Sequence, residues 1–188
     1  MIPEAIFGGR YDADSRWVDI LAAETGWTIS NMGQNGREIP SAAPSFPADT
    51  GLLIVMLGTN DLLQGRSPEH TTERLERFLS GVPLERSKIL LIAPSPVALG
   101  AWVPSPQLID GSHTFARCCK ALAERLGVRF ADAGKWDIPL PMTAHTSRSR
   151  ATRPLPPDFW RNSNETNDTY ISVSSTIDWV WRKLYGCS

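Results

Sequence analysis

The feature that most constrains the fold is the run from Leu52 to Leu57, in which six consecutive residues are apolar. A continuous apolar run of this length is typical of a parallel strand that is buried on both faces. Gly58 ends the run, and the polar residues Thr59, Asn60 and Asp61 follow it. The pattern therefore predicts a polar turn at the carboxyl end of a buried strand, which is the edge where open α/β sheets bind ligands.

Helical and strand-like patterns alternate over most of the chain, which is typical of an α/β domain. The predicted elements are a helix from Ser15 to Gly26, a strand over 27–32, the strand over 52–57, a helix from Ser67 to Val82, a strand over 88–93, a helix over 112–126 capped by Ser112, and a strand over 128–132. Residues 39–49 contain three prolines and are expected to form a surface loop.

Length and charge exclude several classes of protein. The chain has 188 residues, which most simply form one domain, and its formal net charge of −1 gives no general reason to expect a nucleic-acid or membrane partner. No apolar run reaches the roughly 18 residues of a membrane-spanning helix. The first residues show no basic segment followed by an apolar core, so we expect a cytoplasmic protein.

The cysteines and histidines do not suggest a disulfide framework or a metal site. Cys118 and Cys119 are neighbours and Cys187 is distant, so reduced thiols are expected. The three histidines lie far apart, whereas metal ligands usually occur at tighter spacing. We therefore expect neither a metal nor an organic cofactor.

The turn from Gly58 to Asp61 resembles the third conserved block of the SGNH (GDSL-type) hydrolases, a family of esterases and acyltransferases. The resemblance implies a three-layer α/β/α fold with a flavodoxin-like parallel sheet. It also implies that the Asn60 side-chain amide donates to the oxyanion hole. The alternative is that Asn60 and Asp61 only cap the following turn.

The turn over residues 33–38, which Asn31 precedes, resembles the second block of the same family. In that block a glycine directs its N–H toward the developing oxyanion, and the matching residue here is Gly36. The alternative is that Gly33 and Gly36 only supply positive φ angles in a tight connection. Both interpretations can hold together, because a backbone donor needs no side chain.

Two further segments offer weaker candidates. Pro94–Pro96 is similar to the family's fourth block, and Trp102 in the loop after it either lines a substrate pocket or anchors the core. Asp110 and His113 resemble the Asp-x-x-His of the fifth block, which supplies the catalytic base and its partner. In the family this pair precedes the final helix, whereas here a helix and a strand follow, so helix-start residues are the simpler interpretation.

The chain departs from the family at both ends. It contains no Gly-Asp-Ser triplet, which carries the nucleophile after the family's first strand, so by resemblance the first strand is missing. We therefore assign residues 1–140 to the SGNH-type domain and 141–188 to an atypical C-terminal segment. Within that segment, the β-prone run 169–177 fills the vacant strand position, pairs with another chain, or is disordered.

A shift of reading frame is our hypothesis for the origin of the atypical segment. Back-translation of residues 141–159, read from the third base of the Pro141 codon, permits Asp-Gly-Ala-His-Phe-Thr-Glu-x-Gly-His, which resembles the fifth block. Our hypothesis is that a frameshift near Leu140 replaced this block. Sequencing the encoding DNA tests it, since a gene that lacks these codons in the shifted frame would refute the idea.

The resemblance implies an acyl-ester hydrolase that acts on small carboxylic esters and is impaired by the absent serine block. The alternative is a non-catalytic remnant of the same fold that binds ligands or assembles with copies of itself, so a homo-oligomer is left open. A doubly wound nucleotide-binding protein is disfavoured, because the sequence contains no Gly-x-Gly-x-x-Gly or phosphate loop.

Overall fold

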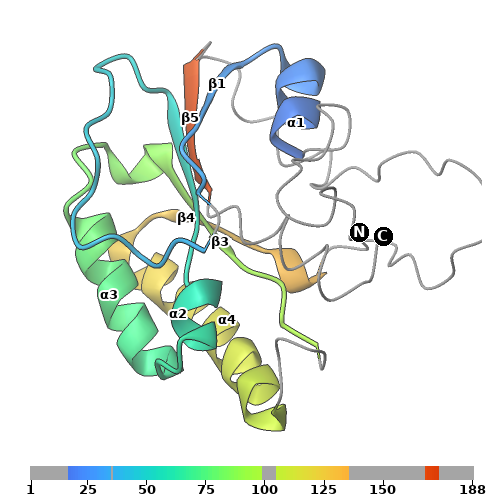
Figure 1. Ribbon diagram of the computed structural model, residues 1–188. Coiled ribbons are helices and arrows are strands. Elements are labelled where there is room, and N and C mark those ends of the chain that lie inside the picture. Colours follow the sequence, from blue (N-terminus) through green and yellow to red (C-terminus); the bar gives the residue numbers. More distant parts are fainter. Residues whose placement is uncertain (1–16, 35, 99–104, 136–167, 174–188) are drawn as a thin grey trace, which may run out of the picture.

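The computed structural model describes residues 17–34, 36–98, 105–135 and 168–173. Figure 1 shows a single sheet with helices on both sides. Two short 3-10 turns, Arg86–Lys88 and Ala133–Lys135, accompany the longer elements. The helices and strands are α1 (Trp17–Thr25), β1 (Thr28–Asn31), β2 (Leu52–Met56), α2 (Thr59–Leu63), α3 (Pro68–Ser80), β3 (Ile89–Ala93), α4 (Pro106–Leu126), β4 (Arg129–Asp132) and β5 (Asp168–Val173).

The sheet has the order β1-β5-β2-β3-β4, and all neighbouring strands run parallel. Helix α1 covers one face, while α3 and α4 cover the other (Figure 1). The architecture is therefore the three-layer α/β/α arrangement that the sequence predicts.

The strand between β1 and β2 comes from the C-terminal segment. Asn31 of β1 pairs with Ile171 of β5, and Ile171 pairs with Ile54 of β2. In the flavodoxin-like order 2-1-3-4-5, this second position belongs to the first strand of the chain. Here the last described strand occupies it, so the polypeptide returns from β4 at one edge of the sheet to a position next to the other edge.

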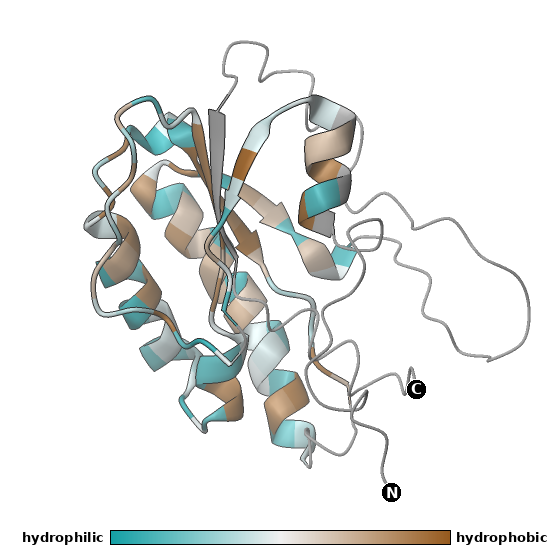
Figure 2. Cartoon of the chain, turned by 45° about the horizontal axis from the view of Figure 1, so that its top comes forward, coloured by the Kyte–Doolittle hydropathy of each residue, from teal (hydrophilic) through white to brown (hydrophobic). Residues whose placement is uncertain are grey.

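Alternating residues of the inner strands enter two separate cores. Leu53 and Val55 of β2 pack with α3 and α4, whereas Leu52 and Ile54 pack with α1. All five residues of β2 and all five of β3 are buried. Figure 2 shows hydrophilic and hydrophobic residues alternating along α3 and α4, as expected for helices that bury one face.

Most of the predicted elements are confirmed. Strands lie within 27–32, 52–57, 88–93 and 128–132, and α3 begins after the predicted cap Ser67, whose hydroxyl accepts a hydrogen bond from the His70 N–H. Leu75, Phe78, Leu79 and Val82 are all buried in one core. Among the described helices, none is long and apolar enough to cross a bilayer.

The predicted start of α4 is wrong by six residues. The helix begins at Pro106 rather than at Ser112, and Ser105 occupies its N-cap position. Proline is favoured in the first turn because its missing N–H would have no helical partner there. Ser112 lies inside the helix, where its hydroxyl donates to the Ile109 carbonyl and accepts from the Val97 N–H.

The segment 39–49 contains no helix or strand, but its first residue does not belong to a surface loop. Ile39 is only 1% exposed and lies in the core beneath α3 and α4. The expectation of a surface loop is therefore wrong at this end of the segment.

Candidate active site

The candidate site is formed by two loops that leave the sheet at the same edge. β1 ends at Asn31 and β2 ends at Met56, and the strands run in one direction with β5 between them. The segments that follow them, residues 32–34 and 36–38 after β1 and residues 57–61 with the first turn of α2 after β2, therefore both start from the carboxyl edge (Figure 1). Open parallel sheets bind their ligands at this edge.

The loop after β1 is shaped by local hydrogen bonds and by one positive φ angle. The Asn31 carboxamide oxygen accepts from the Gly33 N–H at 2.8 Å, and the Arg37 N–H donates to the Gln34 carbonyl at 3.2 Å. Gly36 has φ +74°, yet a Cβ built there would meet nothing within 4 Å. Glycine at this position is therefore favoured by backbone conformation and not by lack of space.

The loop after β2 is tightly packed, in contrast to the first. Gly58 has φ +112°, and a Cβ there would lie 2.3 Å from Cζ of the buried Phe115 ring. The close approach of this backbone to α4 lets α2 start directly after the strand. As a result, Asn60 and Asp61 lie in the first turn of α2 and are both buried.

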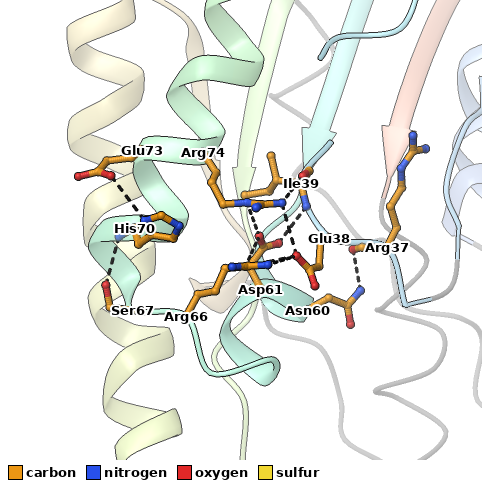
Figure 3. A network of polar contacts seen from close by, with 10 residues as sticks. All are labelled: Arg37, Glu38, Ile39, Asn60, Asp61, Arg66, Ser67, His70, Glu73 and Arg74. Carbon is orange, nitrogen blue, oxygen red and sulfur yellow. Dashed lines mark hydrogen bonds and ion pairs between the residues drawn. The ribbon is translucent and has the colours of Figure 1, made fainter. Parts of the chain in front are cut away.

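Asn60 connects the two loops. Its side-chain Nδ2 donates to the Arg37 carbonyl at 2.8 Å, one residue beyond Gly36 (Figure 3). The structure therefore places Asn60 against the residue that directly follows Gly36, although the two candidate oxyanion residues lie 24 positions apart in the sequence. A backbone N–H and a carboxamide are the kinds of neutral donor that stabilise an oxyanion in acyl transfer.

Asp61 binds the end of the same loop at Ile39. Its Oδ2 accepts from the Ile39 N–H at 2.9 Å, and its Oδ1 lies 2.9 Å from Nε of Arg74. Burial raises the pKa of the Asp61 carboxyl, although the Ile39 N–H and the Arg74 guanidinium act in the opposite direction. The Ile39 hydrogen bond and the charge of Arg74 therefore offset part of the cost of burying this carboxyl group, while Oδ1 and Arg74 Nε face each other as an ion pair without a hydrogen bond of good geometry.

Glu38 supplies the second carboxylate of the network. Its Oε2 accepts from Arg66 at 2.7 and 3.2 Å and lies 3.4 Å from Arg74. The hydrogen bond from Arg66 lowers the pKa of Glu38, and the positive charges of both arginines act in the same direction. Two carboxylates and two guanidinium groups therefore neutralise one another beside the candidate site (Figure 3).

The weaker candidates lie elsewhere. Asp110 and His113 are exposed on α4, and among the described residues no hydrogen bond or ion pair joins either of them to Gly36 or Asn60. Their interpretation as helix-start residues is also wrong, because α4 has already begun at Pro106. Trp102 lies outside the described residues.

The capping alternative for Asn60 and Asp61 is wrong. The N-cap of α2 is Gly58, which has no side chain. The Asn60 side chain instead donates to the loop after β1, and the Asp61 carboxylate accepts from it. No local sequence pattern indicates Arg66 or Arg74, because they contact Glu38 across 28 and 36 residues. Within the described part of the chain, no group of three or more His, Cys, Asp or Glu is placed to hold a metal ion.

Comparison with known proteins identifies relatives for this arrangement. The profile of the GDSL-like Lipase/Acylhydrolase family matches residues 4–159. No curated protein matches the chain significantly. The profile covers most of the sequence, including both loops of the candidate site.

Several solved structures share the fold. A protein from Agrobacterium tumefaciens that is thought to be an arylesterase is 27% identical, with a TM-score of 0.56 over 68% of this chain and 76% of that one. A carbohydrate acetylesterase from Sinorhizobium meliloti, Est24, is 26% identical, with a TM-score of 0.50 over 67% and 74%. The aryl esterase of M. smegmatis, at 24% identity and a TM-score of 0.54 over 67% and 74%, shows the same fold. Family and neighbours together support an ester hydrolase function.

Proposed function

Because the chain belongs to the GDSL-like lipase/acylhydrolase family, we propose that it binds small carboxylic esters between the loops after β1 and β2. In this proposal the Gly36 N–H and the Asn60 carboxamide are the donors to the ester carbonyl oxygen as it becomes an oxyanion. The observation that carries the proposal is the hydrogen bond from Asn60 to the Arg37 carbonyl, which joins the two donor-bearing loops.

The expected chemistry is limited by the absence of the Gly-Asp-Ser triplet that carries the nucleophilic serine in this family. In this family a serine hydroxyl attacks the ester carbonyl, a histidine accepts its proton, and an aspartate orients the histidine. The sequence lacks the Gly-Asp-Ser triplet, so we propose that acyl transfer is impaired while the ester-binding donors are retained. An oxyanion hole and substrate binding alone can still exceed the reaction in water by roughly 10³–10⁴-fold.

The names of the structural neighbours support a proposal for the substrate class. One relative acts on carbohydrate acetates and the others are named as aryl esterases, so acetyl esters of aromatic or sugar alcohols are the substrates we propose. p-Nitrophenyl acetate and an acetylated sugar compare the two alcohols directly. We also propose a cytoplasmic protein without nucleic-acid or membrane partners, which agrees with the free thiols of Cys118 and Cys119. Measurement of the molar mass in solution tests whether the protein forms a homo-oligomer.

A carboxylate product analogue tests the donors without requiring turnover. We expect acetate to shift the amide signal of Gly36 and the side-chain amide signals of Asn60 in a nitrogen-15 NMR titration. Asn60→Ala should abolish the response at Gly36, while Gln64→Ala, an exposed residue at the end of α2, should leave it unchanged. An acetate response that is identical in the Asn60→Ala variant would contradict the proposal.

Turnover provides the second measurement. Where hydrolysis of p-nitrophenyl acetate exceeds the buffer rate, Asn60→Ala should lower kcat by about 10²–10³-fold, the usual cost of one oxyanion donor. A fluorophosphonate probe then reports whether any serine is activated. Labelling of a serine together with rapid turnover would contradict the proposed impairment.

A further inference from the structure

A buried ion pair outside the proposed donors holds one loop residue by both of its backbone groups. The Ile39 N–H donates to Oδ2 of Asp61 at 2.9 Å, and the Ile39 carbonyl accepts from Arg74 at 2.7 Å. Asp61 and Arg74 also lie against each other, with Oδ1 and Nε 2.9 Å apart. Ile39 lies outside every helix and strand, so these side chains satisfy the groups that a neighbouring strand would otherwise bond.

The side chain of Ile39 provides a third point of attachment for this residue, because it is buried in the core. It is 1% exposed and packs in the core beneath α3 and α4. The Asp61 carboxyl is fully buried, and the Arg74 side chain is 24% exposed. Rotation of Ile39 about its backbone would therefore break two hydrogen bonds, one of them to a buried charge, and expose an apolar side chain.

The two residues before Ile39 are also held by side chains, one on α2 and one on the segment between α2 and α3. Glu38 accepts two hydrogen bonds from Arg66, and the Arg37 carbonyl accepts one from Asn60. Three successive residues of the loop after β1 are thus held by groups on α2, on α3 and on the segment that connects these helices. Gly36 comes directly before this held segment.

We propose that Asp61 is a positioning residue, which together with Arg74 fixes residues 37–39 and so sets the place of the Gly36 N–H relative to the Asn60 carboxamide. The proposal rests on the proposed function, because it concerns the two donors named there. Asn60 and Asp61 are consecutive on α2. The second residue of α2 therefore carries one proposed donor, and the third residue anchors the loop of the other donor.

Nitrogen-15 NMR and amide hydrogen exchange of unliganded protein test the inference. Asp61→Asn keeps the size of the side chain but removes the charge that the Ile39 N–H and Arg74 contact. Hydrogen bonds to charged groups correspond to about 10- to 100-fold in an opening equilibrium. We expect exchange of the Ile39 amide to accelerate by about that factor, with shifted signals for the Gly36 amide and the Asn60 side chain.

A matched control is available on α3. Glu76 also pairs with an arginine, Arg125 at 2.6 Å, but that pair is exposed. Glu76→Gln should leave the Ile39 exchange rate and the Gly36 and Asn60 signals unchanged. Where turnover is measurable, Asp61→Asn should lower kcat with little change in KM, because a misplaced donor weakens binding of the transition state more than binding of the ester.

The outcomes separate this inference from the proposed function. Faster exchange at Ile39 with unmoved Gly36 and Asn60 signals would overturn the positioning role and leave Asp61 as a stabilising residue only. If Asp61→Asn does not fold, Glu38→Gln tests the same connection through a carboxylate that is one third exposed. An absent acetate response in the unmodified protein would contradict the proposed function, while the unliganded signals would still test the position of the two groups.

Discussion

The replacement Gly58→Ala should destabilise the protein more than any other glycine replacement at the described sheet edge. Gly58 has φ +112°, and an added Cβ would lie 2.3 Å from Cζ and 2.5 Å from Cε1 of Phe115. The Phe115 ring is 1% exposed and cannot move into solvent without leaving the core. Both a conformational penalty and an overlap therefore oppose the new methyl group.

The magnitude is the sum of these two effects. A non-glycine residue at such a φ costs about 1–3 kcal/mol. Forcing an extra methyl group into a packed core costs typically about 1–3 kcal/mol more. A loss of about 2–6 kcal/mol in the free energy of unfolding corresponds to a fall in Tm of roughly 4–24 °C for a chain of this size.

Thermal and urea unfolding of four variants separates the two effects: Gly58→Ala, Gly65→Ala, Phe115→Leu and the double variant Gly58→Ala/Phe115→Leu. Gly65→Ala is the matched control, because Gly65 has φ +85° but nothing within 4 Å of its added Cβ. Phe115→Leu in the Gly58→Ala background should recover part of the loss by relieving the overlap, which a double-mutant cycle measures. Equal losses for Gly58→Ala and Gly65→Ala would refute the assignment of Gly58 to a close-packed turn.

Three further outcomes follow from the sheet, the core thiol and the ion pairs. Ile171→Pro removes an N–H from a strand with neighbours on both sides, so it should cost about 3 kcal/mol or more in urea unfolding. Burial raises the pKa of Cys119, so a Cys118→Ser variant should react with a thiol reagent at position 119 only after denaturation. The pKa of Glu38 is lowered, so its ion pairs stabilise the fold above the usual carboxyl range and are lost as pH falls through the lowered pKa. The Tm difference between wild type and Glu38→Gln should therefore shrink as the pH is lowered from about 6 to about 3.

Local patterns predicted the elements whose formation is decided within a few residues. The apolar run Leu52–Leu57 and the run before Ala93 became buried strands because both faces of the sheet are covered. The Ser67-Pro68 start signal worked for α3, and the equivalent Ser105-Pro106 signal marks the true start of α4. The latter was missed because Ser112 is also a residue type favoured at the N-cap, whereas in the structure Gly111 and Ser112 lie inside the helix.

Features that depend on distant partners were not predictable in the same way. Periodicity showed that the segment around Ile171 is β-prone and left filling of the vacant strand position as one of three alternatives. The pattern did not decide among them, whereas in the structure Ile171 pairs with Asn31 and Ile54. Strand order depends on which edges remain unpaired after the other strands have formed, and an open inner position strongly favours insertion. The assignment of residues 141–188 to a separate segment stays a prediction.

The position of β5 also explains why the site depends on side-chain contacts. Because β5 separates β1 from β2, the ends of the two donor-bearing strands are two strand spacings apart, about 9.6 Å. No backbone ladder can join their loops across that gap, since each strand bonds only with its immediate neighbours. The contacts from Asn60 to the Arg37 carbonyl and from Asp61 to the Ile39 N–H bridge this distance. The proposed positioning of Gly36 relative to Asn60 therefore depends on α2 and its ion pairs more directly than on the sheet. Substitutions in α2 should affect the proposed site at smaller cost to global stability than substitutions in β5.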